Sequence, residues 1–191
     1  VRVFDFAVTR WDGSSSTDWN TAANWSDNTV PGSNSDVVIP NVANDPVIPS
    51  GNFEINDIEL ENGATLQVVS GGSLTLNGEL DNSGSVTIQD GGSFLQGTGS
   101  NILGSGTFSI QRQGSSLYNM WGSPITAQSG VPGSSYEYVS SASTQDDGDD
   151  ENDPGWSSYN GTMTPGKGYA GQGGNLATFT GTPNNGNVNY S

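Results

Sequence analysis

The sequence predicts an all-β chain whose centre is a short right-handed parallel β-helix, a solenoid with three strands and about 20–22 residues per coil, followed by an irregular small β-domain. Apolar positions recur in step between residues 53 and 110, and three separate columns of side chains share that step. The composition agrees, because 28 glycines among 191 residues and a hydrophobic fraction of 31% are typical of many short strands joined by tight turns. Charged residues make up only 13%, which argues against a disordered chain.

The first ten residues are expected to lead into this architecture. Residues 1–10 alternate apolar and polar side chains, and this period of two predicts a strand from a preceding domain or a linker. Because Val1 already lies inside that strand, we expect the chain to be a fragment of a longer protein.

Residues 11–52 are predicted to form a tryptophan-rich N-terminal cap together with the first strands. Short apolar runs at 37–40 and 46–49 predict strands, and their prolines favour edges or corners rather than the middle of a ladder. Trp19 and Trp25 come just before the first coil, so we expect them to cover the end of the apolar column where it would otherwise meet water.

The β-solenoid coils are predicted for residues 53–114. Side chains at i and i+2 of a strand point to one face, and stacked coils bury them in a continuous column. A β-sandwich of regular hairpins is the alternative, but hairpins do not require every third strand to match. The matching pairs are Leu60/Leu80, Leu66/Val86 and Leu74/Phe94 at 20 residues, Leu80/Ile102 and Val86/Phe108 at 22, and Val47/Leu66 at about one period.

Residues 115–191 are predicted to form the irregular β-region, because the periodicity stops there. Tyr136–Val139 predicts one strand, and Phe179, which lies between two threonines, predicts another. Asn185 and Gly186 predict a hairpin turn into a final strand, which we expect to be truncated at the end of the chain.

Charge and composition exclude several classes of function. Four basic residues against twenty acidic ones give a net charge of −16, so nucleic acid is excluded as a partner. No apolar run is long enough for a membrane span, so we expect no direct insertion into a membrane. Without histidine or cysteine, Ser-His-Asp and Cys-His catalysis are excluded and the usual zinc ligands are missing.

An acidic run at residues 146–153 holds the candidate metal ligands. Calcium takes six to eight oxygen ligands, many of them carboxylates, and is the only cofactor that the sequence suggests. The run lacks the spacing of an EF-hand, and the alternative is a solvated acidic loop. The candidate ligands are Asp146, Asp147, Asp149, Asp150 and Asp153.

Two aromatic residues beside this run are candidate ligand-stacking residues. Trp156 and Tyr159 follow it closely, and aromatic rings can stack on sugar rings. The alternative is that they pack in the interior of a glycine-rich domain.

The coils also carry carboxylates on outward positions. Glu59 and Glu61 precede Glu79 and Asp81 by about one period, and paired carboxylates at about 5–10 Å can hydrolyse glycosides. The coils contain no lysine or histidine to complete a lyase site, so simple solvation of these side chains is the alternative. The sequence therefore predicts no catalytic residues.

The order of several short motifs, from Trp11 to the end of the chain, resembles a module of large cell-surface and adhesin-like proteins that gliding, polymer-degrading Bacteroidetes of the Flavobacteria type export by type IX secretion. The resemblance implies an extracellular location on the outer-membrane exterior. It also implies partners among other domains of the same chain, extracellular polysaccharide, or the secretion and surface-anchoring machinery. The motifs are Trp19-Asn20-x4-Trp25, Val30-Pro31, Asp36–Pro40, Trp121–Pro124, Pro165–Tyr169 and Phe179–Gly186.

Three functions remain open at this point. The first is a non-catalytic structural and adhesive module of a large secreted or cell-surface protein. The second is a carbohydrate-binding module of a secreted polysaccharide-degrading enzyme. The third is a fragment of a β-helix polysaccharide lyase or hydrolase.

Overall fold

The computed structural model describes residues 8–138 and 155–185, and the chain consists of two compact units, 1–112 and 113–191. The described residues contain strands and one 3-10 turn, η1 (Ala22–Asn24), and no α-helix. The prediction of an all-β chain is therefore confirmed.

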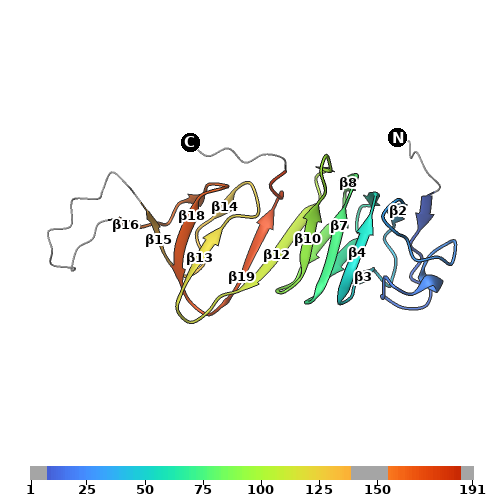
Figure 1. Cartoon of the computed structure of the whole chain (residues 1–191), viewed down its shortest axis with the longest axis horizontal. Coiled ribbons are helices and arrows are strands. Elements are labelled where there is room, and N and C mark those ends of the chain that lie inside the picture. The colour runs from blue at the N-terminus through green and yellow to red at the C-terminus, as the bar shows by residue number, and fades with distance from the viewer. Residues whose placement is uncertain (1–7, 139–154, 186–191) are drawn as a thin grey trace. The chain divides into compact units, whose positions relative to one another are not determined.

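The first unit is a parallel β-solenoid, as predicted, and its strands are stacked side by side in Figure 1. The chain visits three parallel sheets in turn, completes three coils and opens a fourth. Neighbouring strands within each sheet come from successive coils. The first sheet contains β1 (Val8–Arg10), β2 (Asp36–Ile39), β5 (Asp57–Leu60), β8 (Glu79–Asn82) and β11 (Asn101–Leu103). The second contains β4 (Gly51–Ile55), β7 (Gly72–Leu76) and β10 (Ser93–Gln96), and the third contains β3 (Val47–Ile48), β6 (Thr65–Val68), β9 (Ser85–Ile88) and β12 (Thr107–Gln113).

The register confirms most of the predicted columns and corrects two. Four pairs lie opposite one another as expected: Leu66 and Val86, Leu74 and Phe94, Leu80 and Ile102, Val86 and Phe108. Leu60, however, lies opposite Asn82, while Ile58 takes the place beside Leu80. Val47 lies opposite Gln67, so the first coil is also shifted from the expected pairing. A shift of two residues keeps the same side chains pointing inward. Periodicity alone therefore cannot distinguish the expected pair Leu60/Leu80 from the observed pair Ile58/Leu80.

Three tryptophans close the N-terminal end of the solenoid core. Trp11, Trp19 and Trp25 are at most 1% exposed and belong to the same buried cluster as the coil leucines and isoleucines. Trp25 lies edge-on to both others, with ring centroids 5.0 Å from Trp11 and 4.7 Å from Trp19. The indole N–H of Trp25 donates to the Trp19 carbonyl at 3.0 Å, so burial leaves no unpaired donor there. The cap that the sequence predicts is present.

Tight contact between coils leaves no room for a side chain at Gly84. A Cβ built there would lie 2.3 Å from the carbonyl oxygen of Ala64 in the previous coil. That oxygen accepts the Ser85 N–H at 3.0 Å, so it cannot move away without loss of a ladder hydrogen bond.

We therefore expect Gly84→Ala to lower the free energy of unfolding by about 1–3 kcal/mol through overpacking. Gly32→Ala is the matched control, because nothing lies within 4 Å of the Cβ position at Gly32. Urea unfolding followed by circular dichroism measures both variants. Equal midpoints for the two would contradict the close approach at Gly84.

The second unit is antiparallel and irregular. Its larger sheet has the order β13-β18-β15-β16, and the predicted strand at Tyr136 is confirmed as part of it. The predicted strand around Phe179 is also confirmed, and the predicted hairpin at Asn185 and Gly186 extends outside the described residues. The strands are β13 (Tyr118–Gly122), β14 (Gln128–Ser129), β15 (Ser134–Tyr138), β16 (Trp156–Ser158), β17 (Thr162–Met163), β18 (Gly168–Gln172) and β19 (Leu176–Gly181).

Candidate functional site

The antiparallel sheet of the second unit has one buried and one exposed face. Trp121 on β13 lies opposite Tyr169 on β18, and both side chains are buried. Trp121 also contacts Phe179 of β19, with ring centroids 5.9 Å apart. Because side chains alternate along a strand, the neighbours of Trp121 and Tyr169 point to the opposite side of the sheet.

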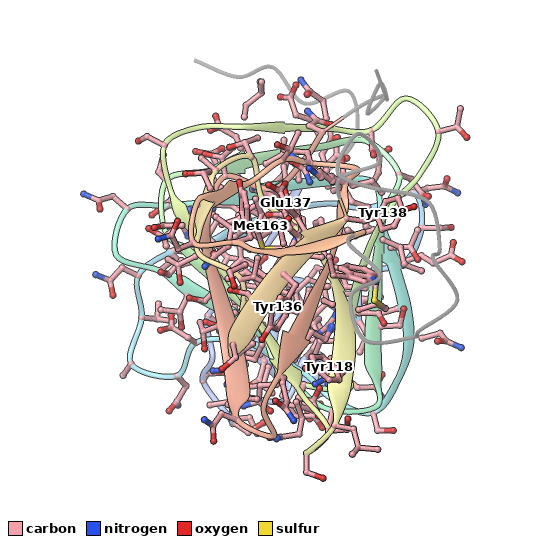
Figure 2. The ribbon with its side chains drawn as sticks, turned by 90° about the vertical axis from the view of Figure 1, so that its left-hand side faces the viewer. Tyr118, Tyr136, Glu137, Tyr138 and Met163 are labelled. Carbon is pink, nitrogen blue, oxygen red and sulfur yellow. The ribbon has the colours of Figure 1, made fainter. Side chains whose placement is uncertain are left out.

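That opposite side carries a concentration of large apolar residues, which we call the aromatic face. Residues directly opposite in an antiparallel ladder share a face, and the pairs are Tyr118–Gln172, Met120–Ala170, Tyr136–Ala170, Tyr136–Ser158 and Tyr138–Trp156. The aromatic face is defined by Tyr118, Met120, Tyr136, Tyr138 and Trp156. Figure 2 labels the three tyrosines of this face.

The residues of the aromatic face are unusually exposed for their size. Tyr118 is 59% exposed, Met120 67%, Tyr138 52% and Trp156 46%. Among the described residues, the tyrosines and tryptophans that are about half exposed or more all lie on this face. A contiguous apolar patch on a soluble domain commonly marks a site of interaction.

The aromatic face is hollowed rather than flat. A hollow of about 440 Å³ is lined by Tyr118, Met120, Tyr136, Trp156 and Ala170. Rings meet edge to face around it: Tyr118 and Tyr136 at 6.1 Å between centroids, and Tyr138 and Trp156 at 5.7 Å. The small side chain of Ala170 lies on the strand between the tyrosines and forms the floor of the hollow.

Around the aromatic side chains, the polar groups that the described strands place on the same face are uncharged. Gln172 lies opposite both Tyr118 and Ser134, and Ser158 lies opposite Tyr136. The described strands place no charged side chain on this face, because Glu137 points to the other side with Tyr169. The arrangement can therefore stack apolar ring surfaces and exchange hydrogen bonds.

A cluster of titratable groups lies away from the aromatic face. Lys167 donates a charge-assisted hydrogen bond to Glu137 at 2.5 Å and lies 5.6 Å from the Tyr169 ring centroid. The hydrogen bond to Glu137 raises the pKa of Lys167 above its ordinary value. Burial alone would raise the pKa of Tyr169, but its hydrogen bonds with Thr164 and Tyr159 lower that pKa.

The pH dependence of stability follows from the raised pKa of Lys167. From neutral pH up to the unfolded-state pKa of about 10.5, the Lys167–Glu137 pair contributes fully to stability, and its contribution is lost as the pH rises through the higher folded-state pKa. Since the side chains are 37% and 23% exposed, the pair contributes at most about 1 kcal/mol. We expect Lys167→Met to lower Tm at pH 7 and the difference from the wild type to shrink above about pH 11. A difference that stays constant over this range would contradict the role of the ion pair.

The predicted ligand-stacking residues lie in two different places. Trp156 is part of the aromatic face, at the end of β16. Tyr159 lies one residue beyond β16, packs against Tyr169 at 4.9 Å and donates its hydroxyl to the Thr162 carbonyl. Burial, followed by the hydrogen bond to Tyr169, raises the pKa of Tyr159.

Besides Trp156, the structure places four further residues on the aromatic face. The sequence marks its three tyrosines only as rings that could stack on sugars, and it gives no role to Met120. Tyr118 and Met120 are two residues apart, as are Tyr136 and Tyr138, so each pair lies on one side of its strand. This alternation was the available signal. The pairing that brings the strands together had no counterpart in the sequence, because no repeat covers this region.

The candidate metal ligands lie outside the described residues: Asp146, Asp147, Asp149, Asp150 and Asp153. Within the described ranges, no group of three or more acidic side chains could hold a metal ion.

The outward carboxylates of the coils do not all stack as pairs. Glu59 lies opposite Asp81, but Glu61 forms an ion pair with Arg10 at 2.9 Å. In the same described ranges, no helix is long and apolar enough to cross a membrane.

These features define an all-β protein that combines a parallel solenoid with a second unit bearing an exposed aromatic sheet face. The chain belongs to the family described as a domain of unknown function, DUF8693, whose model matches residues 10–191. No curated protein and no solved structure gives a significant match to the chain.

Proposed function

We propose that the chain is a non-catalytic structural and adhesive module of a large secreted or cell-surface protein. The observation that carries this proposal is the aromatic face of the second unit, where four large side chains are about half exposed or more. Leaving such side chains in water is unfavourable, so a surface that gathers them is best explained by a partner that covers them. In this proposal the second unit makes the contact.

The first unit supports the structural part of the proposal. Its coils hydrogen-bond to one another through parallel ladders and bury one continuous column of leucine, isoleucine and valine side chains. A stacked, capped repeat of this kind is suited to act as a spacer that holds a binding surface away from an anchor.

The non-catalytic part of the proposal is supported by the side chains available. The chain has no histidine or cysteine and one lysine. That lysine, Lys167, is hydrogen-bonded to Glu137 on the side of the sheet opposite the aromatic face.

The proposed location and partners rest on the motif resemblance. It supports export by type IX secretion and a place on the outer-membrane exterior. The proposed partners are the other domains of the same chain or the anchoring machinery.

Adhesion is tested with beads that display the whole chain, retained under flow on films of neutral polysaccharide, anionic polysaccharide and protein. We expect retention on at least one film and its loss in Tyr118→Ser/Tyr136→Ser/Trp156→Ser, provided that circular dichroism shows the variant to be folded. Equal retention of both chains, or retention on no film, contradicts adhesion through this face. Release of new reducing or unsaturated sugar ends would contradict the non-catalytic assignment.

A carbohydrate-binding module of a secreted polysaccharide-degrading enzyme is the second candidate, and the hollow of about 440 Å³ with its aromatic lining favours it. The domains that neighbour this chain in its full-length gene distinguish the two candidates. A catalytic neighbour supports the second, and a series of further adhesive repeats supports the first.

Calcium binding by the acidic run stays a proposal based on the carboxylates of residues 146–153. Isothermal titration with calcium in the millimolar range is expected to give heat for the wild type and none for Asp149→Ala/Asp150→Ala. If neither protein gives heat, the acidic run does not bind calcium under these conditions and the proposal is wrong.

A further inference from the structure

We infer that the ligand of the aromatic face is an uncharged glycan, held with its sugar rings against Tyr136 and Trp156 in the hollow floored by Ala170. This inference rests on the proposed adhesive function and narrows it to one class of ligand. The shape of the hollow, the polar groups beside it and the distribution of charge support it.

The shape of the hollow suits sugar rings. Aromatic side chains line it on both sides of the strand that carries Ala170, and Ala170 keeps its floor low. Its volume of about 440 Å³ lies within the usual range of about 300–1,000 Å³ for small-ligand sites. A pyranose ring has apolar C–H surfaces above and below and hydroxyl groups around its edge, so its faces can stack on aromatic rings while its edge stays hydrated.

The polar groups beside the hollow fit the hydroxyl edge of a sugar. Ser134, Ser158 and Gln172 lie on the same face of the sheet as the aromatic side chains. A hydroxyl group both donates and accepts hydrogen bonds, and an amide carries one acceptor and two donors, so each can match sugar hydroxyls. Protein–protein interfaces are enriched in arginine, which the described strands do not place on this face.

Charge selects against acidic polysaccharides. The chain carries a net charge of −16, so its overall field repels polyanions. Lys167, the cation nearest in sequence to this sheet, is held by Glu137 at 2.5 Å on the opposite face. An anionic glycan would therefore be repelled without a compensating ion pair, whereas a neutral glycan would experience no such repulsion.

Other exposed apolar residues do not form an equivalent site. Val8, Leu95, Leu103, Leu117 and Leu176 are exposed, but they are aliphatic and come from separate strands or turns. Aliphatic side chains lack the flat ring surface on which a sugar stacks. This contrast makes an exposed leucine of the first unit a suitable control.

The test is affinity electrophoresis of the full chain in gels that contain soluble polysaccharides. The neutral probes are hydroxyethylcellulose, galactomannan and arabinoxylan, and the anionic probes are alginate and polygalacturonate. We expect retardation by at least one neutral probe and by neither anionic probe. Because no ion pair is involved, retardation should be the same at roughly 50 and 500 mM NaCl.

The variants locate the binding. Tyr136→Ala/Trp156→Ala is expected to weaken retardation about tenfold or more, as truncation of central aromatic anchors does. Leu95→Ala, which removes a side chain that is 52% exposed on β10 of the solenoid, should leave it unchanged. Circular dichroism and urea midpoints establish that the variants are folded, and tryptophan fluorescence should change on binding in the wild type but not in the double variant.

The possible outcomes separate this inference from the function on which it rests. Retardation by an anionic probe alone, or equal retardation of the wild type and the double variant, overturns the inference. If no neutral probe binds while beads still adhere to a film through the aromatic face, the ligand is not a neutral glycan and adhesion stands. If the wild type elutes from a size-exclusion column as a dimer and the double variant as a monomer, a second copy of the chain covers the face, and this result overturns the inference. Failure of both assays overturns the inference and the adhesive function together.

Discussion

Leu80→Ala is expected to lower the free energy of unfolding by about 2–5 kcal/mol, because it opens a cavity in the middle of the solenoid column. Leu80 is fully buried and lies between Ile58 of the previous coil and Ile102 of the next. The coils on both sides are fixed by ladder hydrogen bonds, so they cannot close over the space that the leucine side chain leaves. Urea unfolding followed by circular dichroism measures the change.

The matched control for Leu80→Ala is Leu103→Ala, the same substitution in the same sheet. Leu103 lies opposite Asp81, points outward and is 44% exposed. We expect its free energy of unfolding, measured in urea, to stay within about 0.5 kcal/mol of the wild-type value. Similar losses in the two variants would show that the inward column is not what holds the coils together.

Trp25→Ala is expected to cost about 3–5 kcal/mol, because it removes the central ring of the tryptophan cap. Trp25 contacts both Trp11 and Trp19, and its indole N–H satisfies the Trp19 carbonyl. Loss of the ring leaves that carbonyl unpaired and opens the end of the apolar column to water.

The position of the cap predicts where the damage appears. Repeats contact only their neighbours, so fraying should begin at the coil nearest the cap. Amide hydrogen exchange of Trp25→Ala should therefore accelerate more in β2 and β3 than in β9 and β10. Uniform acceleration over all coils would contradict a local role for the cap.

The solenoid could be predicted from the sequence because its information is local and repeated. Each inward pair, such as Leu74 and Leu76, fixes a face, and the recurrence of pairs fixes the neighbours. The register of the first sheet could not be fixed in this way. Leu60 lies opposite the buried polar residue Asn82, whose side chain accepts the Gly84 N–H at a turn, and an apolar pattern cannot anticipate such a partner.

The aromatic face could be predicted only in part. Trp156 and Tyr159 are favoured from the sequence because both are aromatic and both follow the acidic run, but closeness in sequence does not show that their surroundings differ. Tyr159 lies three residues further on, past the end of β16, and packs against Tyr169 instead. Tyr118 reaches Tyr136 through pairings of both their strands with β18, which is more than thirty residues from either in sequence. Long-range pairing without a repeat leaves no local trace.

Hydrogen–deuterium exchange of the full chain, with and without each neutral polysaccharide and each adhesive film material, shows which strands a bound partner covers. We expect a bound partner to slow exchange in β13, β15, β16 and β18 and to leave the coils β5 to β10 unchanged. Protection confined to the outward surfaces of the coils, or no protection of the antiparallel sheet by any partner, would contradict this expectation.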